Sequence, residues 1–177
     1  MKPIDHERLV FLSGVVTKEV ALLQQSIHEL QPVFDDKTDA EIALLLPNTP
    51  TPSRLAEQLE LFAGRFSRLQ DTVGDKLLEQ LLRSLGEPPL AQLAKLDRAE
   101  ALGWLASADA WQETRQLRNL LVHEYIADAA LLVISMRTAL SRCLLLTDTA
   151  ARLTAEVGKL VAQSRLNIPA KPSAGSS

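Results

Sequence analysis

The chain has 177 residues, enough for one domain with a substantial core, and 46% of them are hydrophobic, as in an ordinary globular protein. The net charge of −3 excludes an overall basic surface, so binding to RNA would need a local basic cleft, and we expect no DNA partner. The only cysteine, Cys143, excludes an intrachain disulfide, and one cysteine with three scattered histidines offers no zinc spacing.

The hydrophobic runs and the start of the chain bear on its location. Charged residues precede a short apolar run at the N-terminus, which is not the pattern of a secretory signal peptide. No apolar run approaches the roughly 20 residues that span a bilayer. We therefore expect a cytoplasmic protein with no membrane partner, no metal and no cofactor. Cys143 lies in a leucine-rich segment and is expected to be a small core residue.

The composition favours helix over sheet, because aromatic residues make up only 4% of the chain while leucine and alanine are abundant. Leucine and valine recur at spacings of three and four from about Ile4 to about Leu30, which predicts the first helix. Pro32 should end or bend that helix. Thr38 and Glu41 have the spacing of a capping box, so a short helix should follow, before a proline-rich loop.

A second long helix is predicted to start at Thr51 or Ser53 and to run to about Leu81, with leucine, phenylalanine and valine forming its core stripe. Gly64 and Gly74 lie inside this helix. They would either permit another helix to approach closely or allow a bend.

The polar side of the second long helix carries Arg65 and Arg68. One reading is a solvated face on which acidic and basic residues pair along the helix. The other reading is the wall of a cleft, with both arginines available to a phosphate or to RNA.

Two short helices are expected next, one over 90–96 and one over 98–105 with Asp97 as its N-cap. Asp109 is predicted to cap the helix that follows, which carries Trp111 into the core.

The last helix should run from about Ala129 to about Leu166, with Asp128 as its N-cap. Residues 167–177 are rich in proline, alanine, glycine and serine and are predicted to be a flexible tail. Strand patterns are absent from the sequence. The predicted fold is therefore a single all-α domain over residues 1–166, an antiparallel helical bundle.

The most informative stretch reads Arg118-Asn119-Leu-Leu-Val-His123-Glu-Tyr125, near the end of a predicted helix. On an ideal helix Arg115, Arg118, Asn119 and His123 cover one side within roughly 140°. Asn119 and His123 are four residues apart, close enough for the amide to touch the ring. Arginine can hold a phosphate in a bidentate fork and histidine can move a proton near neutral pH, so this side suits a phosphodiester. The alternative is a structural helical histidine flanked by leucines.

The spacing of Arg118, His123 and Tyr125 (R-x4-H-x-Y), with Asn119 directly after the arginine, resembles the motif of the HEPN superfamily. It is most similar to the HepT-type toxins that are paired with minimal nucleotidyltransferase (MNT) antitoxins.

The segments at 65–71 and 96–104 also resemble that family, in the expected order, and the resemblance covers roughly residues 5–160. The resemblance implies an all-helical, homodimeric, metal-independent endoribonuclease, the toxin of a type VII-like toxin–antitoxin system, with RNA such as tRNA or mRNA as its substrate.

The same resemblance implies roles for the motif residues. The ribose 2′-OH would attack the adjacent phosphate, Arg118 would stabilise the developing charge, and His123 would act as acid or base. Asn119 would orient His123 or bind a phosphate oxygen. Arg115 would be a further phosphate contact, unless it forms a surface ion pair instead.

In the HepT family the tyrosine two residues after the histidine is AMPylated by the cognate nucleotidyltransferase, which implies neutralisation through Tyr125. Without that role Tyr125 would be a partly buried aromatic residue with its hydroxyl at the rim. Two other functions stay open. One is a non-catalytic HEPN module that binds nucleotide or phosphate and partners a nucleotidyltransferase, and the other is a purely structural dimerising bundle.

Overall fold

The computed structural model describes residues 6–46, 53–123 and 128–166, without the side chains of Val122, His123, Arg165 and Leu166. Every regular element in these ranges is a helix, which confirms the predicted all-α bundle. The elements are α1 (His6–Asp36), α2 (Asp39–Leu44), α3 (Arg54–Asp71), the π-helix η1 (Thr72–Leu77), α4 (Leu78–Ser84), α5 (Gln92–Ala101), α6 (Ala108–His123) and α7 (Ala129–Leu166).

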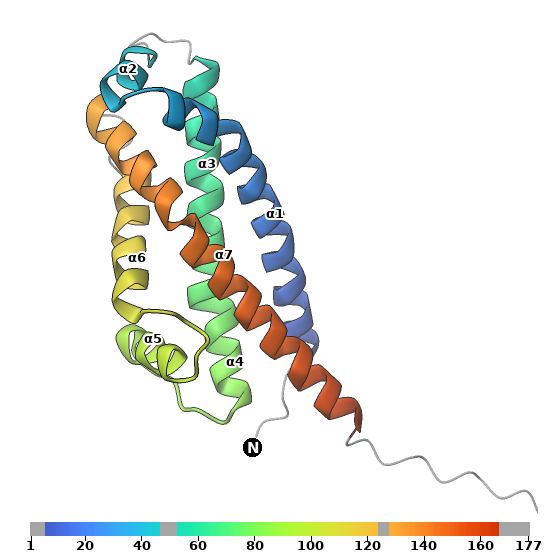
Figure 1. Cartoon of the computed structure of the whole chain (residues 1–177). Coiled ribbons are helices and arrows are strands. Elements are labelled where there is room, and N and C mark those ends of the chain that lie inside the picture. The colour runs from blue at the N-terminus through green and yellow to red at the C-terminus, as the bar shows by residue number, and fades with distance from the viewer. Residues whose placement is uncertain (1–5, 47–52, 124–127, 167–177) are drawn as a thin grey trace, which may run out of the picture.

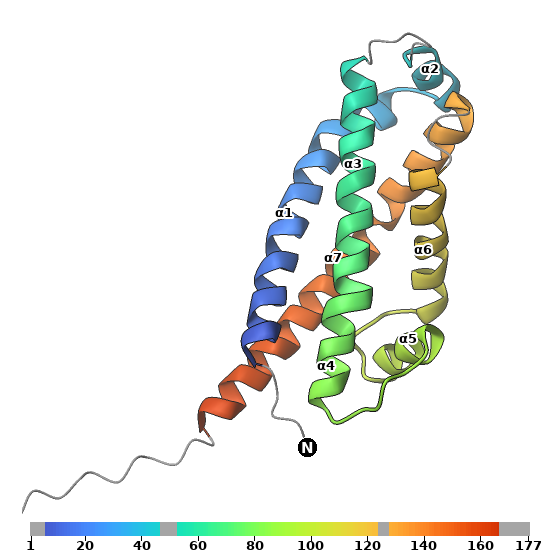
Figure 2. The ribbon, with the colours of Figure 1, turned by 180° about the vertical axis from the view of Figure 1, so that it is seen from behind.

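Four long rods make up the bundle, and chain neighbours among them run in opposite directions (Figure 1). The second rod is continuous, because α3, η1 and α4 follow one another without a break from Arg54 to Ser84. Seen from behind, this rod lies between α1 and α6, with α7 crossing on the far side (Figure 2). The α3 rod therefore has two seams, one with α1 and one with α6.

The predicted core stripe of the second long helix is confirmed. Ser53 caps α3, since its Oγ accepts a hydrogen bond from the backbone N–H of Ala56 at 3.2 Å. The side chains of the stripe are completely buried from α3 through α4: Leu59, Phe62, Phe66, Leu69, Val73, Leu77 and Leu81. The hydrophobic burial of this stripe holds the rod in the bundle.

Pro32 was predicted to end or bend the first helix, and it does not end it, since α1 continues through this proline to Asp36. Pro32 is exposed, so the helix loses one backbone hydrogen bond without burying an unpaired group. Beyond it, Phe34 is buried in the core, and Arg137 of α7 donates to the carbonyl oxygens of Phe34 (2.7 Å) and Lys37 (3.0 Å). These long-range contacts hold the last turn in place.

The caps predicted between the second and the last long helix were wrong. Asp97 lies inside a single helix, α5, and caps nothing. Ser107, and not Asp109, caps α6: its Oγ accepts from the backbone N–H of Ala110 at 3.1 Å. The Glu100 carboxylate reaches across the turn and accepts from the N–H of Ala108 at 2.6 Å.

Asp128 does cap α7, because its Oδ1 accepts from the N–H of Ala130 at 2.8 Å, as predicted. Cys143 on this helix is buried, which confirms it as a core residue, and burial raises its pKa to about 12. The expectation that no apolar run is long enough to span a bilayer needs correction. Within Ala129–Ser164, α7 is long and apolar enough, by length and composition alone, to cross a membrane. The helix also packs against α1, α2 and α6, as a bundle core helix does.

The proline-rich loop at 47–52 and the predicted tail at 167–177 lie outside the described residues.

Candidate functional site

The predicted motif begins on α6, which turns one side to the core and its polar flank to the α3 rod. Trp111, Thr114 and Leu121 are buried on the core side. Arg115 and Arg118 are about one-third exposed and reach toward the α3 rod. The sequence therefore places both arginines at the seam between the two helices.

Arg118 is held by two side chains. Its Nη2 donates to Oδ2 of Asp71 at 2.5 Å, and its Nη1 donates to Oδ1 of Asn119 at 2.9 Å. Its Nε is buried and has no hydrogen-bond partner among the described residues. The Arg118 side chain is 28% exposed. A guanidinium in this position is sheltered from water but reachable, as phosphate recognition requires.

Arg115 forms the second ion pair of the seam, with its Nη1 at 2.8 Å from Oδ1 of Asp75. The two acids are four residues apart on the α3 rod, and the two arginines are three residues apart on α6. We call Asp71, Asp75, Arg115 and Arg118 the ion-pair cluster. Two cations face two anions there, so the cluster is formally neutral.

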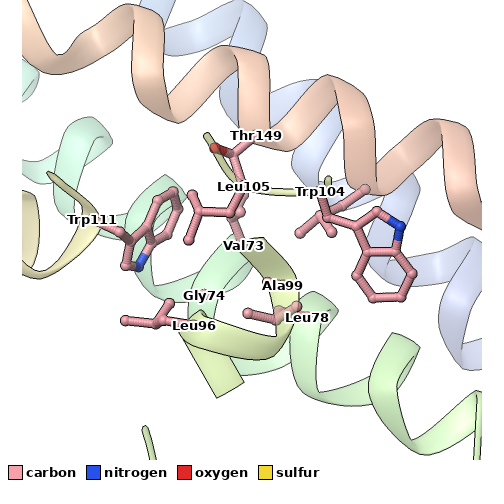
Figure 3. Close-up of a pocket in the computed structure, with 10 residues that line it drawn as sticks. Val73, Gly74, Leu78, Leu96, Ala99, Trp104, Leu105, Trp111 and Thr149 are labelled. Atoms are coloured by element: carbon pink, nitrogen blue, oxygen red, sulfur yellow. The ribbon is translucent and has the colours of Figure 1, made fainter. Parts of the chain in front are cut away.

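The π-helix η1 carries Asp75 of this cluster and faces α6 through Gly74. Its i→i+5 hydrogen bonds fit an extra residue into the turn, and such turns occur frequently at functional sites. Gly74 in this turn meets Trp111 of α6 so closely that a Cβ on Gly74 would lie 3.0 Å from the indole. Both residues line a small apolar void of about 10 Å³. Figure 3 shows the residues around this void. Of the two glycines predicted to permit a close approach, Gly74 does so, whereas a Cβ on Gly64 would meet nothing within 4 Å.

The buried side of the α3 rod near the cluster includes two polar side chains, Gln70 and Ser67. Gln70 is completely buried, and neither atom of its amide has a hydrogen-bond partner among the described residues. The buried Ser67 Oγ, one turn earlier, also has none there. Unpaired buried polar groups cost stability, so this segment is less stable than an apolar packing of the same shape would be.

Arg65 and Arg68 are not brought together with Arg118. The Arg65 guanidinium lies in the other seam, where its Nη1 donates to the carbonyl oxygen of Leu22 (2.9 Å) and to Oγ of Ser26 (2.8 Å) on α1. Arg68 is exposed on the same rod.

A half-buried carboxyl, Glu19 of α1, faces the α3 rod in that other seam. Burial raises its pKa above the ordinary value, and the hydrogen bond from Thr72 and the positive charges of Arg68 and Lys76 only partly oppose this. Asp71 also raises the pKa of Glu19, so a carboxyl of the ion-pair cluster is close enough to act on the α1 seam as well.

His123 is the last residue of α6, five residues after Arg118, and its side chain lies outside the described part of the structure. Tyr125 lies outside the described residues altogether. Among the residues that are described, no group of three or more histidine, cysteine, aspartate or glutamate side chains could hold a metal ion.

Asp71 and Asp75 belong to the site, although reasoning from the sequence did not select them. A signal for them was present: acids four apart on one predicted helix match arginines three apart on another. That signal becomes specific only when the two helices are known to be neighbours.

Comparisons with protein-family models, with curated proteins and with solved structures found no match for this chain.

Proposed function

We propose that this protein is a metal-independent endoribonuclease of the HEPN superfamily and acts as the HepT-type toxin of a toxin–antitoxin pair. The observation that supports this most is the Arg118 guanidinium, which is partly exposed and, among the described residues, is held by side chains only, on the helix that ends at His123. An arginine bound to exchangeable side chains is suited to receive a phosphodiester.

In the proposed reaction the ribose 2′-OH attacks the adjacent phosphorus and the 5′-oxygen leaves, which gives a 2′,3′-cyclic phosphate and a 5′-OH end. Arg118 stabilises the charge on the pentavalent transition state. His123 takes the proton from the 2′-OH or gives one to the leaving oxygen. Asn119, already bonded to Arg118, fixes the guanidinium or orients the His123 ring.

One histidine cannot readily serve as acid and base in the same step. A two-fold homodimer would supply a second His123 and a second Arg118 across a shared cleft. The proposed antitoxin is a nucleotidyltransferase that adds AMP to Tyr125, and the added phosphate and base would block the cleft by bulk and by charge.

A second candidate function is a non-catalytic module that binds nucleotide or phosphate and partners a nucleotidyltransferase. The ion-pair cluster favours it specifically, because Asp71 and Asp75 already neutralise both arginines. With this charge balance little positive charge remains to stabilise a transition state.

The test is cleavage of labelled RNA by the purified protein in excess EDTA, with the intact mass of each preparation recorded. We expect wild type to leave cyclic-phosphate ends, and Arg118→Ala and His123→Ala to lose at least about a hundredfold in rate. Arg142→Ala is the control, since Arg142 pairs with Glu113 on another part of the bundle.

Absence of cleavage by a wild-type protein whose mass shows no added AMP would contradict the nuclease and support the binding module. Added AMP mass would identify the neutralised form, which would then be treated with a phosphodiesterase and assayed again.

A further inference from the structure

Both arginines of the ion-pair cluster already hold an anion that belongs to the chain. Arg118 Nη2 is 2.5 Å from Asp71, and Arg115 Nη1 is 2.8 Å from Asp75. All four side chains are between 28% and 35% exposed, so the pairs are neither sealed in the core nor fully open to water.

We propose that Asp71 and Asp75 are internal competitors for the anions that Arg118 and Arg115 bind, so that the site accepts a polyanionic chain but not a single phosphate. This inference rests on the proposed function and names the substrate class of the same site.

The argument starts from the exchange that a bound phosphate requires. A phosphate oxygen that takes the Nη2–H now donated to Asp71 must displace that carboxylate, so one charge-assisted hydrogen bond is lost for the one gained. A phosphate oxygen that takes another N–H of Arg118 binds beside the Asp71 carboxylate instead. The displaced carboxylate stays on the α3 rod within a few ångströms of the phosphate and repels it. A single phosphate therefore gains little at either arginine.

A nucleic-acid strand can offset this cost because its phosphates are joined. Arg115 and Arg118 lie one helical turn apart, so successive phosphates can exchange with Asp75 and Asp71 together. Once one phosphate is bound, the next is present at a high effective concentration.

The proposal is tested by binding, at constant ionic strength, of inorganic phosphate and of a single-stranded RNA whose riboses are 2′-O-methylated so that it cannot be cleaved. The variants are Asp71→Asn and Asp75→Asn, which keep the size of the side chain. Glu113→Gln is the matched control, because it removes one negative charge from α6 at the pair with Arg142. Thermal unfolding verifies that each variant is folded.

We expect wild type to bind phosphate far more weakly than the RNA. Asp71→Asn should tighten phosphate binding roughly threefold to tenfold, the size of effect of one neighbouring charge at a partly exposed site. Tightening for the RNA should be smaller in proportion, and Glu113→Gln should change neither affinity.

The proposal is overturned if Asp71→Asn binds phosphate no better than Glu113→Gln, including the case in which no variant binds it. RNA cleavage by wild type decides the proposed function separately. Tightened phosphate binding without any cleavage would keep the competition and favour the binding module.

Discussion

Two arginines of this bundle, Arg137 on α7 and Arg118 on α6, are bound in opposite ways. All three nitrogens of the Arg137 guanidinium are engaged: Nε with Asp39 (2.6 Å), and Nη1 and Nη2 with the carbonyl oxygens of Phe34 and Lys37. Its guanidinium also lies 5.1 Å from the centre of the Phe34 ring.

Arg118, in contrast, bonds only to the side chains of Asp71 and Asn119, and its Nε has no partner among the described residues. Backbone carbonyls cannot leave without unfolding a turn, whereas side chains can rotate away. The first arrangement is what a structural clamp needs, and the second is what a binding site needs.

The largest stability effect is expected from the clamp. Arg137→Ala should lower the free energy of unfolding by about 1–3 kcal/mol, because it removes charge-assisted hydrogen bonds and leaves two carbonyl groups unpaired. Arg118→Ala should cost less, about 1 kcal/mol, because the partly exposed Asp71 and Asn119 side chains that it frees can rotate toward water, and it should abolish the proposed cleavage. Urea unfolding of both variants compares them directly. Equal losses of stability would remove the distinction between clamp and site.

The next largest effect concerns the two glycines of the α3 rod. Gly74→Ala should destabilise the protein by about 1 kcal/mol, since a clash with Trp111 outweighs the gain in helix propensity. Gly64→Ala has open space and should stabilise it by about 0.5–1 kcal/mol. If both substitutions stabilise the protein equally in thermal unfolding, the close approach of η1 and α6 is not required.

A third prediction concerns Gln70, the buried and unpaired amide of the α3 rod. Gln70→Leu should stabilise the protein by about 1 kcal/mol, because it removes an unpaired buried amide and keeps a similar volume. The control is Gln25→Leu, because Gln25 is exposed on α1 and its amide donates a hydrogen bond to Glu29. Chemical denaturation measures both variants. Destabilisation by Gln70→Leu would mean that the amide is paired in solution.

The smallest expected effect concerns Glu19 in the other seam. Its pKa is raised in the folded state, so the folded protein holds this proton more tightly than the unfolded chain does, and stability falls as pH rises above the ordinary value of 4.5. Glu19→Gln cannot ionise and should lose that part of the pH dependence. Unfolding curves below pH 4.5 and at neutral pH should show a small gain over wild type only at neutral pH.

The features that the sequence predicted well were local ones. Ser53, Thr38 and Asp128 cap helices as expected, because each satisfies a backbone N–H within three residues of itself. The core stripe of the α3 rod was predictable for a similar reason, since its period lies within a single helix.

The features that the sequence did not predict depend on contacts between distant residues. α1 passes Pro32 because Arg137, on the last helix, holds the turn beyond it. Asp97 has the local preference of a cap but lies inside α5, which begins at Gln92. Glu100, further along that helix, accepts a hydrogen bond from the N–H of Ala108 at the start of α6. The π turn at Gly74 lies against Trp111, and nothing in the local sequence announces it.

The candidate site divides in the same way. Arg115, Arg118 and Asn119 were found from their spacing on one helix, and they lie together at the α3–α6 seam. Their partners Asp75 and Asp71 are 40 and 47 residues away in the chain, so only the packing of the two helices reveals them.

The most direct test is the cleavage of labelled RNA in EDTA by wild type, Arg118→Ala and Arg137→Ala, at a temperature where all three are folded. We predict that wild type and Arg137→Ala cleave at similar rates and leave cyclic-phosphate ends, whereas Arg118→Ala does not cleave. Equal cleavage by Arg118→Ala and wild type would contradict the assignment of Arg118 to the site.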